Sequence, residues 1–469
     1  MQPSAARESG RWLADMPCHL EGQGVATDYA EALLRSMGAH VGRDPGPADM
    51  HPAITWARSG LMALTGRVDG PPQMCPVPLT SCADGVAKAL RAVAPALRGN
   101  LPSGALLLGE RAAIAGLRRN GSISPSGSCH LLRAANGWLA VNLARADDWA
   151  AVPAWLQTEA ATSWDALGAT VARCDAAMLV DRARLLGLAV TAAEAPCRAP
   201  VSWYSVAARG CPVSPGERRG LPLVVDLSSL WAGPLCSHML QSTGARVIKV
   251  ESRTRPDGAR AGAEDFYDVL NSGKQSVALD FGRDGVGRLL DLLARADIVI
   301  EASRPRALRQ LGVIAEDWIV KRPGLTWVSI TGYGREEPRG NWTSFGDDAG
   351  VAAGLSALLQ RLTGEWLICG DAIADPLTGL HAALAALGGH RCGGGHLVSL
   401  ALCDVVSHCV QFLLPGEDAE LRERWLQWSD AARAAGVDST PPSARRPVGK
   451  APSLGADTDA VLAERGDQC

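Results

Sequence analysis

The sequence predicts an α/β protein with a largely parallel sheet and a second, smaller α+β domain. Two observations lead to this class. From residue 221 onward, β-rich runs alternate with helical stretches, and residues 130–200 show a different pattern. The apolar fraction of 47% with 20% charged residues is typical of a globular chain. At 469 residues, the chain has room for two or three domains.

The alternation in the second half is regular. The β-rich runs are LVVDLSSL, RVIKVE, ADIVIEAS, LTWVSITGYG and HLVSLALCD, and segments such as GPLCSHMLQSTGA and GVGRLLDLLARA separate them. Strands that alternate with helical segments in this way form parallel sheets. The first turn, LSSLWAGPL, lacks the G-x-G-x-x-G fingerprint, which disfavours a nicotinamide or flavin enzyme.

Two further segments complete the predicted organisation. Residues 130–200 begin with the β-like run LLRAANGWLAVNL and continue with helical segments that hold three tryptophans, which favours a smaller α+β domain. Residues 436–455 are rich in Pro, Ser and Arg and poor in apolar periodicity. We expect them to form an extended surface strap before a short last helix, without a catalytic group.

Composition narrows the possible partners. The net charge of −3 and the scattered Lys and Arg residues give no basic field for nucleic acid. The N-terminal residues lack a continuous apolar run, and no later stretch approaches the roughly 20 apolar residues of a membrane span, so we expect a cytoplasmic protein that does not contact a membrane. Thirteen dispersed cysteines form no zinc-ligand pattern, so we expect reduced, mostly buried thiols and no metal.

An internal repeat is the most informative pattern. Residues 60–92 overlay residues 354–386 at a constant offset of 294, and residues 29–41 overlay residues 235–247 at an offset of 206. The matched pairs include Gly38 with Gly244, Gly60 with Gly354, Cys75 with Cys369, and Gly85 with Gly379. The two offsets differ by 88 residues, so the first copy lacks most of the predicted sheet. The small-domain pattern follows only the first copy.

Several segments together resemble the class III CoA-transferases, the family of formyl-CoA:oxalate CoA-transferase, carnitine CoA-transferase and α-methylacyl-CoA racemase. They are VVDLSSLWAGPLCSHMLQSTGARVIKVE, LNSGKQSVALDF, ADIVIEASRPRALRQLG, VSITGYG, GDAIADPLTGLHAALAAL and LGADTDAVLAERG. The resemblance covers nearly all of residues 221–411 in family order. It implies a Rossmann-like CoA-binding domain. NGWLAVNLARADDW resembles the family's small domain, but its place ahead of that domain departs from the family order.

This departure suggests a fused internal duplication in which each copy has lost part of its length. We expect a truncated first copy of the large-domain helices in residues 1–110, a small α+β domain in 111–210, a CoA-binding α/β domain in 221–411, and a strap and helix in 412–469. Ordinary members of the family are interlocked homodimers. The resemblance therefore implies a pseudodimer within one chain, and further oligomerisation stays open.

Asp375 occupies the place of the family's catalytic aspartate. A carboxylate can attack a thioester to give a mixed anhydride and CoA thiolate, which then returns to give an enzyme-bound thioester. Asp375 precedes Pro376 and an apolar-periodic run, so it sits at a helix start, where the N–H groups and helix dipole are expected to keep it ionised. The alternatives are that Asp375 merely caps the helix, or that Asp371, which is out of register, is the nucleophile. In the first copy the equivalent position is Ser81, so we expect one site per chain.

The resemblance also indicates CoA contacts. The positions are Trp231, Ala232, Lys249, Ser252, Lys274, Leu279, Ala302 and Arg304. Ser252 and Ala302 replace an Arg or polar residue and an Asn that the family often has, and Arg253, Arg255 and Arg304 could supply phosphate contacts instead. Each arginine could equally be a solvated surface charge, and Lys249 could pair with Glu251.

The expected function is CoA transfer between an acyl-CoA thioester and a carboxylic acid, with CoA as substrate and no permanently bound cofactor. One rival is an acyl-CoA racemase or isomerase, but the racemase branch needs a His where this chain has Phe345-Gly346-Asp347-Asp348. Another rival is a CoA-binding member without turnover. His381 is expected to be a packed residue, and residues 120–128 correspond to a glycine-rich loop of the family with fewer glycines.

Overall fold

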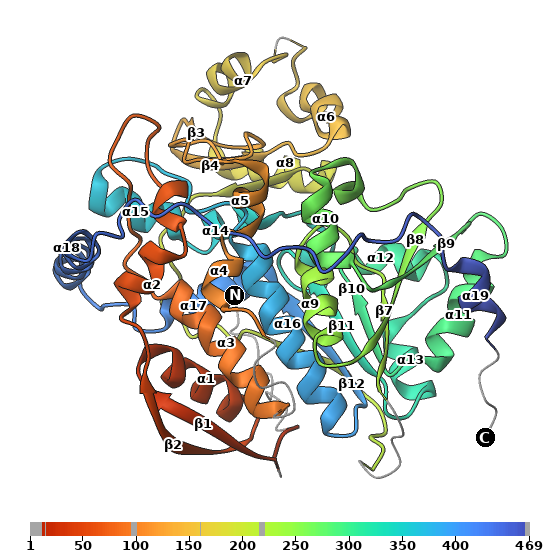
Figure 1. Ribbon diagram of the computed structural model, residues 1–469. Coiled ribbons are helices and arrows are strands. Elements are labelled where there is room, and N and C mark those ends of the chain that lie inside the picture. Colours follow the sequence, from red (N-terminus) through yellow and green to blue (C-terminus); the bar gives the residue numbers. More distant parts are fainter. Residues whose placement is uncertain (1–11, 15, 95–100, 160, 215–220, 465–469) are drawn as a thin grey trace.

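The computed structural model describes residues 12–14, 16–94, 101–159, 161–214 and 221–464 (Figure 1). Its centre is a seven-stranded sheet with the order β6-β12-β11-β10-β7-β8-β9. The strands are β6 (Ser205–Arg209), β12 (His396–Ala401), β11 (Thr326–Thr331), β10 (Ile298–Glu301), β7 (Leu223–Asp226), β8 (Arg246–Ser252) and β9 (Gln275–Leu279). Only β6 runs antiparallel to its neighbour among these strands. The predicted α/β class is confirmed.

Helices cover both faces of this sheet. One face, which includes Val224, contacts α9 (Ala232–Gln241) and α16 (Ala374–Arg391), and the other, which includes Val225, contacts α11 (Gly285–Arg295) and α13 (Ala315–Lys321). Burial on both sides explains the continuous apolar runs in these strands. The remaining helices here are α10 (Glu264–Asn271), α12 (Pro305–Gln310), α14 (Gly346–Ala352), α15 (Leu355–Thr363) and α17 (Leu402–Gln411).

The strand order places a crevice in the sheet. After β7 the chain adds β8 and β9 on one side, and β10, β11 and β12 follow on the other side. The order therefore reverses between β7 and β10, whose carboxyl ends are Asp226 and Glu301. In open α/β sheets, ligands bind in the crevice outside the carboxyl ends at such a reversal.

The first part of the chain repeats the opening of this sheet in miniature. The strands β1 (Pro17–Gln23) and β2 (His40–Ala48) are parallel and joined by α1 (Val25–Ser36). Cys18 pairs with Val41, and in the large sheet Val224 pairs with Val247. Cys18 and Val224 are 206 positions apart, and so are Val41 and Val247. This separation equals the offset of the sequence repeat. The described residues of this part add no further strand to the pair, in agreement with the predicted loss of sheet.

The first part has further helices, and one of them makes a contact that matches a contact in the second part. They are α2 (Pro52–Arg58), α3 (Leu79–Val93), α4 (Gly104–Leu107) and α5 (Glu110–Ala115). Gly85 of α3 packs on α1 so closely that a Cβ would lie 2.6 Å from the Ala26 carbonyl oxygen, and a Cβ on Gly379 of α16 would lie 2.6 Å from the Ala232 oxygen in α9. Helices α3, α16 and α9 lie side by side at the centre of Figure 1. Each glycine therefore permits the same close helix contact.

A separate small domain lies at the top of Figure 1, beside α14. Its antiparallel sheet consists of β3 (Cys129–Ala134), β4 (Gly137–Asn142) and β5 (Ala189–Ala192). Three helices, α6 (Ala146–Leu156), α7 (Trp164–Val171) and α8 (Ala176–Leu186), enclose a core around Trp155. The Trp155 indole donates to the Leu179 carbonyl at 2.9 Å, which satisfies its buried N–H. The strands β4 and β5 pack on α14.

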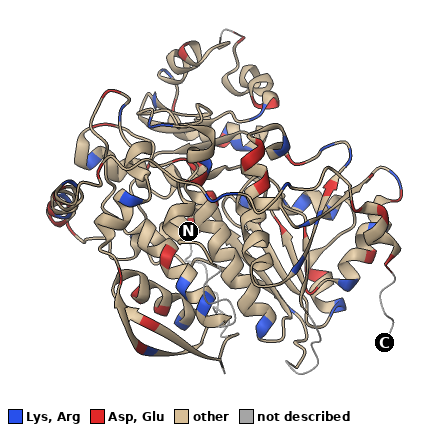
Figure 2. Cartoon of the chain, viewed as in Figure 1, with Lys and Arg blue, Asp and Glu red and all other residues tan. Residues whose placement is uncertain are grey.

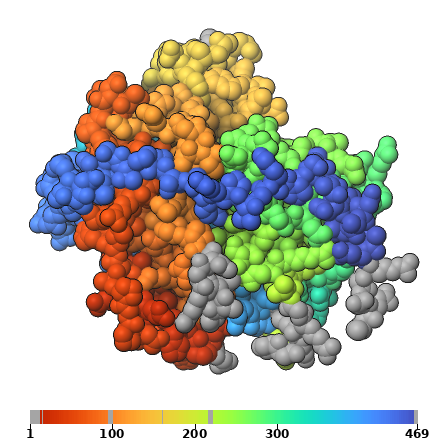
Figure 3. Space-filling view, viewed as in Figure 1, coloured from red at the N-terminus to blue at the C-terminus, as the bar shows by residue number. Residues whose placement is uncertain are grey.

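The C-terminal region contains a helix that the sequence analysis did not predict. This helix, α18 (Asp418–Ala434), packs against α2 and precedes residues 435–457, which have no helix or strand. These residues cross the surface from α18 to α19 (Thr458–Ala463), over both halves of the chain (Figure 3). Pro442 lies against Gly60, and the Ala451 N–H donates to Asp268 at 2.8 Å. The strap therefore ties the first half to the large sheet.

Three expectations from composition can be compared with the structure. Acidic and basic residues are interspersed along the described chain (Figure 2). None of the described helices is long and apolar enough to cross a membrane. The described cysteines are free thiols, and most of them are buried.

Candidate active site

Asp375 lies inside the first turn of α16 and does not cap it. The helix begins at Ala374, its N-cap residue is Ile373, and no side chain caps the helix. The preceding Ala372 has a φ of 45°, a left-handed conformation that is strained for a residue with a side chain. The interpretation of Asp375 as an N-cap therefore does not hold, while its predicted place at the helix start does.

Three helix starts converge on the Asp375 carboxylate. The N–H of Ala232, at the start of α9, donates a hydrogen bond to it. Gly346, at the start of α14, is so close that a Cβ there would lie 2.2 Å from Asp375 Oδ2. A glycine is therefore required for the carboxylate to occupy this position. Positive ends of helix dipoles surround the site, as they do in sites where negative charge develops.

The charge state of Asp375 differs from the expectation. Its pKa is raised to about 7: burial is the largest cause and Asp348 and Asp371 add to it, whereas Arg111 and the Ala232 N–H oppose the rise. The helix starts were expected to keep the carboxylate ionised, but loss of hydration outweighs them. Near neutral pH the group is poised between its acid and its carboxylate form.

Further aspartates surround Asp375. Asp347 accepts from the Ala372 N–H at 2.7 Å, and burial together with Asp371 raises its pKa to about 7. Asp348 accepts from the Asn142 amide of the small domain at 3.0 Å, and burial raises its pKa to about 6. The segment that the sequence analysis compared with the racemase His therefore contributes two buried acids.

Asp371, the alternative candidate for the nucleophile, forms an ion pair with Arg111. It is fully buried, and its two oxygens accept from Arg111 Nε and Nη2 at 2.8 and 2.5 Å. A carboxylate in such a fork is a poor nucleophile because its lone pairs are engaged. The structure thus favours Asp375. Arg111, which the sequence analysis did not single out, belongs to no motif and enters the site only through the fold. The sequence analysis named Gly346 only within the segment compared with the racemase His, and its contact with Asp375 also comes from the fold.

Two of the predicted CoA contacts, Trp231 and Ala232, lie beside Asp375. Trp231 is the N-cap residue of α9, and its ring meets Phe266 edge-on at 5.3 Å between centroids. The Arg111 guanidinium lies 5.5 Å from the Trp231 ring centroid. The buried indole N–H has no hydrogen-bond partner among the described residues. It is therefore a donor that a bound ligand could use.

The two predicted lysines are used within the fold. The buried Lys249 ammonium lies 2.9 Å from Asp257 and not beside Glu251, which pairs with Arg260 instead. Lys274 is also buried, donates to Ser237 Oγ at 2.7 Å, and has a pKa that burial lowers to about 8. Both ammonium groups are buried and have partners within the fold, and their role as CoA contacts stays a prediction.

The other predicted contacts follow the strand ends. Ser252 ends β8, and its hydroxyl accepts from the backbone N–H groups of Thr254 and Arg255 at 3.3 Å. Leu279 is buried in the core below the sheet, so its side chain is not available to a ligand. Ala302 follows β10 and lies against Gly233 of α9, on the wall of the crevice.

Arg304 lies in a group of positive charges between the sheet and the small domain. Its Nη1 lies 3.2 Å from where a Cβ of Gly187 would be, at the end of α8. Burial and the neighbouring guanidinium groups of Arg306, Arg145 and Arg255 lower its pKa. Among the described residues, Arg304 forms no ion pair. Uncompensated arginines at a crevice are typical of a site for anionic groups.

Within the described residues of the first part of the chain, the position that matches Asp375 in the sequence repeat is Ser81, which is not a carboxylate. Ser81 is buried within α3, and Asp84 accepts from Ser103 Oγ and the Ala105 N–H at 2.8 and 3.0 Å. His381 is a packed residue, as expected, because its Nε2 bonds to Tyr29 Oη at 2.8 Å in the core. These groups have structural partners.

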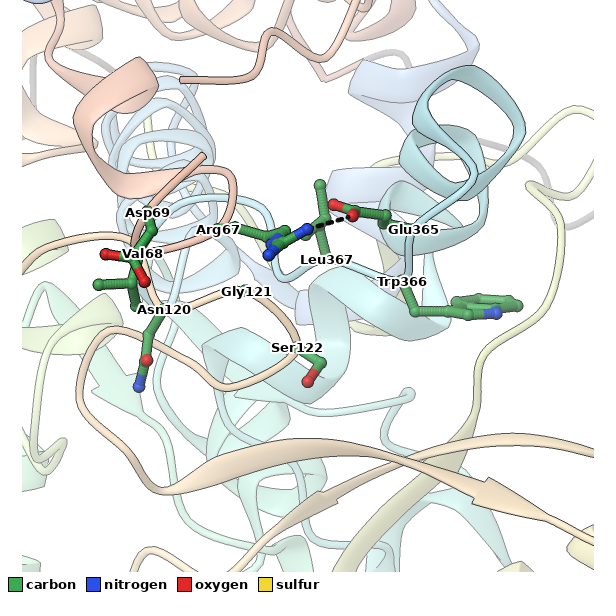
Figure 4. Close-up of a pocket in the computed structure, with 9 residues that line it drawn as sticks. All are labelled: Arg67, Val68, Asp69, Asn120, Gly121, Ser122, Glu365, Trp366 and Leu367. Atoms are coloured by element: carbon green, nitrogen blue, oxygen red, sulfur yellow. Dashed lines mark hydrogen bonds and ion pairs between the residues drawn. The ribbon is translucent and has the colours of Figure 1, made fainter. Parts of the chain in front are cut away.

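The loop at residues 120–128 borders a cleft of about 370 Å³ (Figure 4). An ion pair of 3.1 Å between Arg67 and Glu365 crosses this cleft. Its lining residues are Arg67, Val68, Asp69, Asn120, Gly121, Ser122, Glu365, Trp366 and Leu367. Asp375 is not among them, so this cleft is distinct from the aspartate cluster.

Comparison with known proteins supports the family resemblance. The profile of CoA-transferase family III matches residues 222–425. The chain is similar to the succinate–glutarate CoA-transferase of Agrobacterium fabrum, with 30% identity over 202 residues, which are 39% of this chain and 50% of that protein. It is also similar to a formyl-CoA:oxalate CoA-transferase of Escherichia coli, with 30% identity over 195 residues, 39% of this chain and 47% of that protein.

The chain spans about half the length of these curated relatives. Among solved structures, a CAIB/BAIF family protein from Brucella suis is 28% identical, with a TM-score of 0.36 over 48% of this chain and 59% of that chain. The family profile and the curated relatives confirm the resemblance to the class III CoA-transferases for residues 222–425.

Proposed function

Because residues 222–425 belong to CoA-transferase family III, we propose that the chain transfers CoA between an acyl-CoA thioester and a carboxylic acid, with Asp375 as the nucleophile. The observation that supports this proposal most is the Asp375 carboxylate at three converging helix starts. A pKa near 7 leaves a substantial fraction ionised at neutral pH, and partial desolvation makes that fraction more reactive.

The reaction follows from the position of this carboxylate. Asp375 attacks the thioester carbonyl, the carbon–sulfur bond breaks, and a mixed anhydride forms as CoA leaves as a thiolate. The thiolate attacks the Asp375 side-chain carbonyl and releases the first acid. The incoming carboxylate then attacks the aspartyl-CoA thioester, and the returning thiolate gives the new acyl-CoA and restores Asp375. The Ala232 N–H would stabilise the oxyanion that develops in these steps.

Coenzyme A would occupy the crevice between β7 and β10. Trp231 and Ala302 flank it near Asp375, and Arg304 with Arg255 lies farther out, where the phosphates of CoA would be neutralised. Lys249 and Lys274 would instead support the crevice from below through their buried ion pairs. The site therefore offers an apolar wall for the pantetheine arm and a cationic end for the nucleotide.

We also propose that the chain is a fused internal duplication with complementary deletions. The equal strand registers and the equal glycine contacts support it. So does a direct contact between the thiols of Cys75 and Cys369, which are equivalent in the repeat. Equivalent residues meet each other only near a twofold axis. The first copy would then replace the partner subunit, and one chain would bind one CoA.

One experiment separates transfer from its rivals. The purified protein is incubated with a panel of CoA thioesters, and the products are analysed by mass spectrometry with and without hydroxylamine. A transferase forms an aspartyl adduct that hydroxylamine traps. A racemase or isomerase would exchange the α-hydrogen of the acyl group without forming an adduct. Asp347, with its pKa near 7, could act as the acid or base in that reaction. Retained CoA with neither result would indicate a binding protein and contradict the proposal.

A further inference from the structure

The aspartate cluster is short of positive charge. Asp347, Asp348, Asp371 and Asp375 lie close enough to affect one another, and Arg111 is the cation that acts on both Asp375 and Asp347 within the described part of the chain. Arg111 belongs to α5, before the small domain, and is 260 positions from its partner Asp371. The first half of the chain therefore supplies a charge to a site that otherwise belongs to the second half.

We propose that Arg111 is the positioning residue that holds Asp371 and places a positive charge beside Asp375, so that the first half of the chain completes the active site of the second. The inference rests on the proposed function of Asp375 as a nucleophile. It goes beyond that proposal because it assigns a role to a residue outside the family match.

The geometry of Arg111 suits a fixed charge. Its Nε and Nη2 donate hydrogen bonds to the two carboxylate oxygens of Asp371, and its guanidinium lies over the Trp231 ring. Two planar contacts fix the orientation of the group, which a lysine could not reproduce. The Arg111 side chain is 28% exposed and its partner Asp371 is buried, so the attraction between Arg111 and the buried Asp375 is stronger than between two exposed groups.

The element that carries Arg111 is held in place by the strap. Glu110, directly before Arg111, is buried and accepts from Arg445 Nε and Nη2 at 2.7 and 2.6 Å. Arg445 Nη1 also lies 2.7 Å from His238 Nε2 in α9. Arg445 of the strap thus connects the start of α5 to α9.

The other groups that face the cluster do not replace this charge. On α14 they are Asp347 and Asp348, and before α16 the group is Asp371. The remaining titratable neighbours are the thiols of Cys129 on β3 and Cys403 on α17, and the Tyr333 hydroxyl after β11. Each of these groups is either neutral or negative. Loss of Arg111 would therefore leave the carboxylates uncompensated and raise the pKa of Asp375 above its present value.

The sign of the effect on activity follows directly. The nucleophile is the ionised form, so the rate falls as the pH drops below the pKa of Asp375. Arg111→Gln should move this acid limb to higher pH by about one unit or more, which is a loss of about tenfold at pH 6, with recovery toward wild type at pH 9. Arg111→Lys should lie between the two. Asp371→Asn should move the limb to lower pH, because it removes a neighbouring negative charge.

The test measures kcat/KM for thiolate release between pH 5 and 9 in the full-length protein. Arg361→Gln, which removes an exposed pair with Asp418, is the matched control and should leave the profile unchanged. Opposite shifts for the Arg111 and Asp371 variants support the proposal. An equal loss at every pH for Arg111→Gln, or an unmoved limb, overturns it.

A second readout keeps the inference separate from the proposed function. Carbon-13 NMR of labelled aspartate, with Asp375→Asn to assign the signal, follows the titration of Asp375 without turnover. If the wild type forms no adduct, the proposed function fails, yet an upward shift of this titration in Arg111→Gln still supports the electrostatic role. A titration unchanged by Arg111→Gln contradicts that role in either case.

Discussion

Asp375 is held by contacts that balance one another. Burial, Asp348 and Asp371 favour the protonated acid, while Arg111, the Ala232 N–H and the helix starts favour the carboxylate. The result is a carboxyl group near the middle of its titration at neutral pH. A nucleophile of this kind can attack a thioester and can also leave again as a carboxylate when the anhydride breaks.

The first prediction concerns this residue. Asp375→Ala should reduce transfer to below about a thousandth of the wild-type rate while CoA affinity changes by less than about threefold, because only the covalent step needs the carboxylate. Turnover assays and calorimetric titration with CoA measure the two effects. Ser81→Ala, at the equivalent position of the first copy, is the control and should leave both values unchanged. Wild-type turnover in Asp375→Ala would reject the assignment.

A second prediction concerns the space beside the carboxylate. A Cβ at Gly346 would lie 2.2 Å from Asp375 Oδ2 and 2.3 Å from the Ala372 oxygen. Gly346→Ala should therefore displace Asp375, lower kcat at least about tenfold and reduce the free energy of unfolding by about 1–3 kcal/mol. Gly287→Ala, in open space on α11, should be neutral or stabilising by up to about 1 kcal/mol. Unchanged kcat in Gly346→Ala would show that Asp375 does not need its present position.

At the scale of elements, the sequence predicted what periodicity and repeats encode. The strands of the large sheet, the start of α16 and the offset of the β1–α1–β2 unit follow from apolar patterns and from Pro376. The partners of buried polar groups could not be predicted. Lys249 reads as a polar interruption of a strand, and nothing in its neighbourhood indicates that Asp257 neutralises it. The same limit applies to Arg111, whose partner is 260 positions away.

The helix α18 is a different kind of omission. Its first turn contains Asp418 and Glu420, and its buried positions, Leu421, Trp428 and Ala432, follow helical spacing. These signals were present in the sequence. They were outweighed by the Pro- and Arg-rich composition of the following strap, which made the whole C-terminal region look extended.

The strap supplies the third prediction. Arg445→Gln should leave the buried Glu110 carboxylate without its bidentate partner. A buried charge without a partner is destabilising, so we expect the free energy of unfolding to fall by about 3 kcal/mol. Urea denaturation measures this change. Arg433→Gln, whose pair with Asp430 is exposed, is the matched control with an expected change below about 0.5 kcal/mol. Equal stabilities of the two variants would show that the strap does not hold α5.

At the scale of the whole molecule, the two halves depend on each other. The first half has a two-stranded sheet and no nucleophile at Ser81, and the second half has the large sheet but takes Arg111 and the small domain from the first. Helices α3 and α16 pack together between them, and a large apolar core continues across this contact. Residues 221–469 alone would expose that face, so we expect the fragment to be insoluble or inactive.

The most direct test of a single site per chain is the stoichiometry and position of the hydroxamate that hydroxylamine leaves on the acylated carboxyl group. The full-length protein is treated with a reactive CoA thioester and hydroxylamine, and the adduct is counted by intact mass and located by peptide sequencing. We predict one adduct per chain, on Asp375, and one CoA bound per chain by titration calorimetry. Two adducts, or one adduct on any residue other than Asp375, would contradict the account of a nucleophile in the second half completed by the first.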